Sequence, residues 1–154
     1  MKDQTTPKDP PTMVLVSPEK IAAVMALAPV PHSFAELDEM VSKGLPKGAL
    51  KASIDHICVS AEARRQLLYR IVPEATYKRR RERLSADESE RAERLARIFA
   101  TAAYVWNSDE DARAFLTTPH AMLQGRSPLE VSLTELGARR VEELLWRLFH
   151  GIAA

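Results

Sequence analysis

The sequence predicts an all-α protein, because apolar residues recur at helical spacing along most of the chain and serines stand where those segments begin. The last segment shows this spacing most fully, with apolar side chains at Val141, Leu144, Leu145, Leu148 and Ile152. Three segments are preceded by a Ser-x-x-Glu string, which predicts a capping box at the helix start. These pairs are Ser33/Glu36, Ser85/Glu88 and Ser127/Glu130. Alternation of apolar and polar residues, the mark of a strand, is nearly absent, so we expect a helical bundle.

The composition is typical of a globular protein. The chain has 154 residues, of which 45% are hydrophobic and 28% are charged. A chain of this size can bury a core as one domain or as two small ones. Its net charge of +1 means that any contact with nucleic acid must depend on local charge.

Several features favour a cytoplasmic protein. Cys58 is the single cysteine, which suits a reducing compartment, and it shares an apolar stripe with Ile54, so we interpret it as an inert buried thiol. The first residues are polar and do not resemble a signal peptide. No apolar run approaches the roughly 20 residues that span a bilayer, so no membrane partner is expected.

The chain divides by composition into four parts. Residues 1–12 are polar and proline-rich and predict a disordered arm. Residues 13–44 predict a helical extension, whose apolar face must be buried in its own domain or on a neighbour. Residues 60–83 hold eight lysines and arginines against three acids, and the charge becomes mixed afterwards. We therefore place a boundary near residue 84, between a basic region (45–84) and a C-terminal domain (85–154).

The basic region has the layout of a helix-turn-helix. Residues 60–68 predict one short helix, residues 69–72 a turn, and residues 74–83 a second helix that starts after Pro73. A cationic second helix of this kind can enter the major groove of DNA. The alternative is a solvated basic helix face, which is the commoner origin of such a run. The candidate DNA-binding residues are Thr76, Tyr77, Lys78, Arg79, Arg80, Arg81 and Arg83.

No constellation of residues predicts an enzyme. The four histidines are His32, His56, His120 and His150, and none has another histidine four residues away, as a helical zinc pair would require. The sequence also lacks a glycine-rich phosphate loop and a nucleophile elbow. We expect no catalytic residue, no metal and no cofactor.

The end of the chain carries aromatic residues close to the carboxylate. Trp146, Phe149 and His150 occupy the last turn of the final helix, and Gly151 is a plausible C-cap. Such an end either packs on its own domain or inserts into a partner, and the residues alone leave both readings open.

Specific strings in the C-terminal part resemble the toxin-binding region of Xre-type antitoxins, which are paired with RES-domain toxins. These strings are RAFLTTPH at 113–120, GRSPLE at 125–130, LGARRVEEL at 136–144 and HG at 150–151. Upstream, residues 60–84 are similar to the Xre-like helix-turn-helix of the same family. The resemblance covers about residues 45–154 and leaves residues 1–32 outside.

The resemblance implies an antitoxin of two helical parts, an Xre-like helix-turn-helix followed by a small toxin-binding domain. It implies a complex with a toxin of ADP-ribosyltransferase-like fold that consumes NAD⁺, either by destroying it or by modifying a protein. The C-terminal end covers or enters the NAD⁺ cleft of that toxin. The helix-turn-helix binds the promoter of its own operon, often as a homodimer within a larger complex, and no cofactor is needed.

By this resemblance the toxin-binding residues are Arg139, Arg140, Trp146, Phe149, His150, Gly151, Ile152, Ala153 and Ala154. The sequence departs from the family in two places. Tyr77 stands where an aliphatic residue is common. Residues 152–154 are Ile-Ala-Ala, where an aromatic residue is common near the end.

Two rival interpretations remain. The chain could be a dimeric DNA-binding regulator whose C-terminal part only dimerises. It could also be a toxin-binding module that has lost its DNA function.

Overall fold

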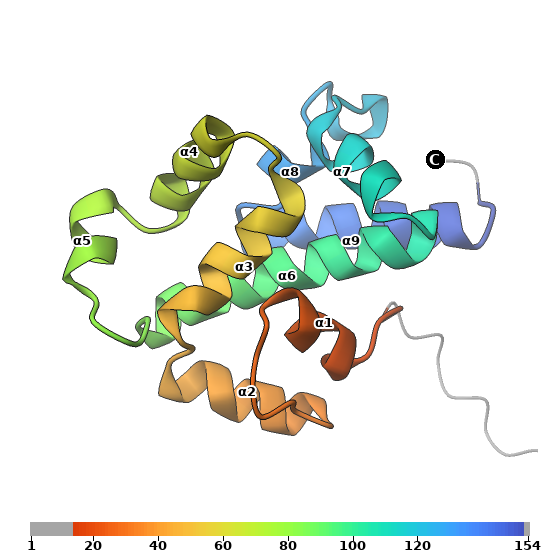
Figure 1. Ribbon diagram of the computed structural model, residues 1–154. Helices are drawn as coiled ribbons and strands as arrows, with labels where there is room; N and C mark the ends of the chain where they lie inside the picture. The colour runs from red at the N-terminus through yellow and green to blue at the C-terminus, as the bar shows by residue number, and fades with distance from the viewer. Residues whose placement is uncertain (1–13, 153–154) are drawn as a thin grey trace, which may run out of the picture.

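The computed structural model describes residues 14–152, which form α-helices and one short 3-10 turn, with no β-strand in this range (Figure 1). The prediction of an all-α fold is confirmed. Residues 1–13, which include the predicted arm, lie outside the described part. In chain order the elements are α1 (Pro18–Val24), α2 (Phe34–Lys43), α3 (Lys47–Ile57), α4 (Ala61–Ile71), α5 (Glu74–Arg79), α6 (Ala86–Trp106), α7 (Asp109–Thr117), η1 (Ala121–Leu123), α8 (Pro128–Val131) and α9 (Glu135–Phe149).

Helix α6 is the central element. It has 21 residues, which at 1.5 Å per residue gives a length of about 30 Å. Helices α1, α2, α3, α7 and α9 all pack against it. Helix α9 runs beside α6 in the same direction (Figure 1). Contacts along the pair join Arg94 to Glu135 near the start of α9 and Tyr104 to Phe149 at its end.

Serine N-caps begin most of the helices, as the sequence predicts, because the hydroxyl accepts a hydrogen bond from an otherwise unpaired backbone N–H. Of the three predicted pairs, Ser85/Glu88 alone forms the full capping box, in which the Ser85 N–H donates to the Glu88 carboxylate. At Ser33 the Glu36 carboxylate accepts from the N–H of His32 instead. At Ser127 the Glu130 carboxylate pairs with Arg70 of α4. The prediction of three capping boxes is therefore wrong at two sites, where other donors take the carboxylate.

One hydrophobic core runs through the molecule from α1 to α9. Phe99 of α6 is 2% exposed and lies near its centre. Cys58 is 8% exposed, and burial raises the pKa of its thiol, which confirms the interpretation as a buried thiol. Helical spacing from Ala92 through Leu95, Phe99 and Ala103 predicts that Trp106 is buried too, but this prediction is wrong, because Trp106 is 41% exposed. The Trp106 ring packs beside the Phe115 ring of the following helix, with centroids 5.8 Å apart, rather than in the core.

The N-terminal extension buries its apolar face in its own molecule. Ile21 and Met25 are almost fully buried, and α1 packs against α6 and α3. The apolar face of α1 is therefore buried within the same chain, whereas Val14, Val30 and Phe34 stay exposed. Among residues 14–152, no helix combines the length and the apolar character that a membrane span requires.

Candidate DNA- and protein-binding surfaces

Helices α4 and α5 are joined by Val72 and Pro73 and form a compact helix pair. The predicted bounds need two corrections. Helix α4 continues to Ile71, through residues that were expected to turn. Helix α5 ends at Arg79 rather than at Arg83. Residues 82–84 are instead held along residues 45–47, where Leu84 donates to the Leu45 carbonyl and Lys47 donates to the Glu82 carbonyl, each at 2.9 Å.

Arg80 is turned toward the protein. Its guanidinium donates to both carboxylate oxygens of Glu88, from Nε at 3.0 Å and from Nη2 at 3.3 Å. Burial alone would raise the pKa of Glu88, but hydrogen bonds from the Ser85 backbone and hydroxyl and from Arg80 hold it below the ordinary carboxyl range. The backbone carbonyl of Arg80 also accepts from Lys47 Nζ at 3.1 Å. Arg80 therefore links the residue that follows α5 to the first turn of α6.

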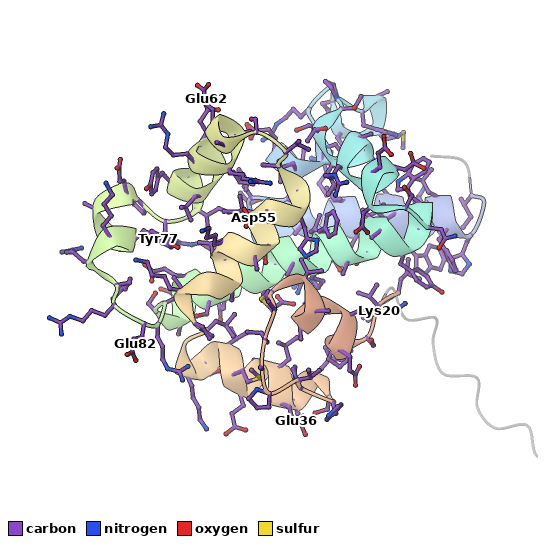
Figure 2. All side chains as sticks on the ribbon, viewed as in Figure 1. Lys20, Glu36, Asp55, Glu62, Tyr77 and Glu82 are labelled. Carbon is purple, nitrogen blue, oxygen red and sulfur yellow. The ribbon has the colours of Figure 1, made fainter. Side chains whose placement is uncertain are left out.

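Two further candidate DNA-binding residues have internal partners. Arg83 Nη1 donates to the Gly44 carbonyl at 2.8 Å. Tyr77 is half-buried, with Lys47 Nζ 4.2 Å from its ring centroid and the Tyr69 ring 6.4 Å away. Figure 2 shows Tyr77 on the inner side of α5, toward α3. The aromatic residue that departs from the family pattern thus packs within the helix pair.

The outward part of this surface is smaller than predicted. Lys78 and Arg79 are exposed on α5, and Arg81 is exposed just after it. Lys78 Nζ lies 2.7 Å from Glu74 Oε1, one helical turn earlier. Thr76 is partly exposed and accepts from Arg79 Nη2 at 3.5 Å. Arg83 is exposed as well, but its guanidinium is bound to the Gly44 carbonyl. We use the name α5 surface for the three cations Lys78, Arg79 and Arg81 together with the partly exposed Thr76.

The end of α9 is closed by a Schellman motif. Gly151 has φ of +68°, its N–H donates to the Leu148 carbonyl at 3.2 Å, and the N–H of Ile152 donates to the Arg147 carbonyl at 2.8 Å. Gly151 thus helps to close the helix, as predicted, although the C-cap residue itself is His150 and Gly151 follows it. The last described turn is therefore an ordered helix end. Ala153 and Ala154 lie outside the described residues.

Aromatic side chains gather at this helix end, and we call them the end cluster. The Phe149 ring lies 5.2 Å from the Tyr104 ring of α6 and 5.0 Å from the His150 ring, and the His150 ring lies 4.3 Å from that of Trp146. Phe149 and Ile152 nevertheless remain 43% and 45% exposed. The end cluster thus packs on its own domain, while Phe149 and the neighbouring Ile152 still present apolar atoms to solvent.

Sequence reasoning missed three residues beside this end. Trp106 ends α6, Phe115 is in α7 and His120 follows α7, and together with Leu148 they line a pocket of about 490 Å³. Trp106, Phe115 and His120 lie in or beside successive elements, and Leu148 follows only 28 residues after His120, so periodicity within one helix could not join them. Tyr104 was missed for the same reason.

Arg139 and Arg140 are not brought together with the end cluster. They precede Phe149 by nine or ten residues, which corresponds to about 15 Å along the helix. Arg139 Nε lies 3.7 Å from Glu135 Oε1, and Arg140 donates to the amide oxygen of Gln124.

The two surfaces lie at opposite ends of the molecule. In Figure 2, Tyr77 of α5 is on one side, whereas Lys20, whose Nζ is 4.9 Å from the Tyr104 ring centroid, is on the other. Helix α6 connects them, since Glu88 in its first turn contacts Arg80 and Tyr104 near its last turn contacts Phe149. Within residues 14–152, no group of three His, Cys, Asp or Glu side chains is arranged to hold a metal ion.

Two protein families match consecutive parts of the chain. Residues 36–97 match the antitoxin Xre-like helix-turn-helix domain, and residues 101–151 match the antitoxin Xre/MbcA/ParS C-terminal toxin-binding domain. Antitoxin Xre of Pseudomonas putida is 36% identical over 84 residues, which cover 53% of this chain and 53% of that protein. The chain thus spans about half the length of this curated relative. The chain therefore carries, in this order, a segment similar to the Xre-like helix-turn-helix domain and a segment similar to the toxin-binding domain of such antitoxins.

Proposed function

We propose that this chain is an antitoxin that neutralises a RES-type, NAD⁺-consuming toxin with the end of α9 and represses its own operon through α4 and α5. One observation carries the proposal. An ordered helix end with half-exposed aromatic side chains lies within the segment that matches the toxin-binding domain. Exposed apolar clusters of this kind are typical of protein interfaces.

The proposed mechanism is exclusion of substrate by a protein surface, which requires no cofactor and no catalytic residue. Phe149, His150, Gly151 and Ile152 would cover the NAD⁺ cleft, with Trp146 and Tyr104 supporting them. The Schellman motif favours this role, because a helix end that is already ordered loses less conformational freedom when it binds.

DNA binding is proposed for the α5 surface. Lys78, Arg79 and Arg81 point outward and can reach phosphates or guanine edges, with Thr76 beside them. A single α5 covers only one short site, and helix-turn-helix proteins usually bind two half-sites as a dimer. We therefore propose a homodimer at the promoter, within a complex that also holds the toxin. We propose that the chain carries out both roles in the cytoplasm.

Two variants separate the two roles. Deletion of residues 149–154 should abolish rescue of growth when the chain is co-expressed with the RES-type protein of its operon, while promoter binding persists. The triple variant Lys78→Ala, Arg79→Ala, Arg81→Ala should do the opposite, and it leaves the structural residue Arg80 in place. Full rescue by the truncated chain would refute cleft blocking and favour the alternative, a dimeric DNA-binding regulator without a toxin-blocking role. Unchanged promoter binding by the triple variant would favour a toxin-binding module without DNA function.

A further inference from the structure

A pocket lies beside the end cluster, where the end of α6, the helix α7 and the segment after α7 meet. Its volume is about 490 Å³. Its lining comes from residues 106–148, all of which lie within the segment that matches the toxin-binding domain. Leu148 of α9 is the last lining residue and directly precedes Phe149. The pocket thus shares the last turns of α9 with the surface proposed above for toxin binding.

Three aromatic rings form the wall of the pocket. The Trp106 and Phe115 rings have centroids 5.8 Å apart at an interplanar angle of 41°, and the His120 ring meets the Phe115 ring edge-on at 6.2 Å. Trp106 is 41% exposed, so an entering group can reach its ring. Aromatic faces arranged around an open space attract cations as well as apolar groups, and tryptophan attracts cations most strongly.

The pocket also has an acidic side. Asp111 lines it, and Asp109 and Glu110 precede Asp111 in the first turn of α7. Acids in a first turn are favoured by the helix dipole, which accounts for their presence in α7 but not for their place beside an aromatic wall. Within residues 14–152, none of these three carboxylates forms an ion pair.

The nearest basic residue of α7 does not neutralise this turn. Arg113 Nη1 donates to the His56 carbonyl of α3 at 3.2 Å. The carboxylates of this turn are exposed and have no ion-pair partner among residues 14–152, so an incoming cation can reach them.

We propose that this pocket binds an arginine or lysine side chain of the toxin, with the cation against the Trp106 and Phe115 rings and its charge met by Asp111. The inference rests on the proposed antitoxin function and adds a second anchor to it. Arginine suits the pocket best, because its planar guanidinium can stack on a ring while its N–H groups pair with a carboxylate. The volume also leaves room for apolar atoms on either side of the charged group.

The test compares Asp111 with its neighbour Glu110, which belongs to the same turn but does not line the pocket. The affinity of the full chain for the purified RES-type protein is measured by titration calorimetry. Asp111→Asn should weaken binding roughly tenfold, as expected when a charge-assisted pair loses one charge. Glu110→Gln should change the affinity less than about twofold, since an exposed charge outside the contact contributes little.

A second pair of variants separates contact from overall charge. Asp111→Lys and Glu110→Lys change the net charge equally, so a larger loss for Asp111→Lys points to the pocket. Trp106→Leu should weaken binding roughly tenfold, like Asp111→Asn. Thermal unfolding and promoter binding verify that each variant is folded. Replacing the partner cation of the toxin with glutamate should restore binding to Asp111→Lys, and a scan of exposed arginines and lysines of the toxin would identify it.

The outcomes distinguish this inference from the proposed function. A wild-type chain that does not bind the RES-type protein contradicts the proposed function. Wild-type binding with equal effects at Asp111 and Glu110 contradicts the pocket alone. A change in the self-association of Asp111→Lys, measured by sedimentation, with toxin affinity unchanged would assign the pocket to a second copy of this chain and also overturn the inference.

Discussion

Arg80 and Glu88 form a two-bond ion pair, with Nε 3.0 Å from Oε1 and Nη2 3.3 Å from Oε2, that joins the exit of α5 to the first turn of α6. Glu88 is only 5% exposed, and Arg80 is turned toward it. The neighbours of Arg80 in the basic run, Lys78, Arg79 and Arg81, are exposed. One arginine in a row of four basic residues therefore stabilises the fold, and the others remain available for a partner.

We expect Arg80→Ala to lower the free energy of unfolding by about 1–2 kcal/mol, because it leaves a buried carboxylate without its cation. Arg79→Ala should leave stability within about 0.5 kcal/mol. In promoter binding, Arg79→Ala should reduce the salt dependence by about one unit for a lost phosphate contact. Urea denaturation and mobility shifts at several salt concentrations provide the measurements. Equal stability of the two variants would contradict a structural role for Arg80.

The Arg80–Glu88 ion pair predicts that the free energy of unfolding depends on pH. The folded-state pKa of Glu88 lies below the ordinary value of 4.5, so its contribution to stability is present above that pH and is lost as the pH falls through the folded value. Glu88→Gln should therefore be less stable than the wild type at pH 7, and the gap should narrow below pH about 4.5 as the wild-type carboxylate takes up a proton. Urea denaturation at a series of pH values measures the gap. Glu39→Gln is the control, since the pKa of Glu39 is also lowered but its carboxylate is exposed and well screened.

Substitutions of Gly151 and Gly48 test whether toxin binding depends on the ordered end of α9. Gly151 has a positive φ, which costs a residue with a Cβ about 1 kcal/mol, so Gly151→Ala should loosen the Schellman motif and weaken toxin binding. Gly48 lies in α3 with open space around its Cα and no positive φ. Gly48→Ala should therefore stabilise the fold by roughly 0.5 kcal/mol and leave toxin binding unchanged. Calorimetric titration and thermal unfolding report the two effects. Unchanged toxin affinity in Gly151→Ala would separate the helix end from binding.

Gly137 tests the packing of α8 against α9. A Cβ at this position would overlap the carbonyl oxygen of Val131, which is backbone and has little freedom to move. Gly137→Ala should reduce the free energy of unfolding by about 1–3 kcal/mol, as overpacking in a core does. Chemical denaturation measures this loss. The variant should lose stability without any change in charge or in exposed side chains, so a neutral result would contradict the close approach of the two helices.

Local signals predicted the fold well. Serine caps at Ser33, Ser60, Ser85 and Ser127 mark helix starts correctly, because a cap depends on residues within one turn. The end of α5 was mispredicted for the opposite reason. It is set by contacts between residues 82–84 and residues 45–47, which lie nearly 40 positions earlier in the chain.

The candidate surfaces were only partly predictable. The aromatic residues in the last turn of α9 stand out in the sequence, but Tyr104 and Phe149 are 45 positions apart and meet only because α6 and α9 run in parallel. The inward direction of Arg80 depends on Glu88, which is itself positioned by the Ser85 cap. A count of basic residues cannot distinguish Arg80 from Arg79.

Helix α6 starts in the segment that matches the helix-turn-helix domain and ends in the segment that matches the toxin-binding domain. The junction of the two segments is therefore a continuous helix rather than a flexible tether, and α6 acts as a lever arm of about 30 Å. A tilt of 10° at the DNA end would displace the far end by about 5 Å. The angle at which α5 seats in the groove would then determine where a toxin is held relative to the DNA axis, and whether two toxins on neighbouring half-sites fit or collide.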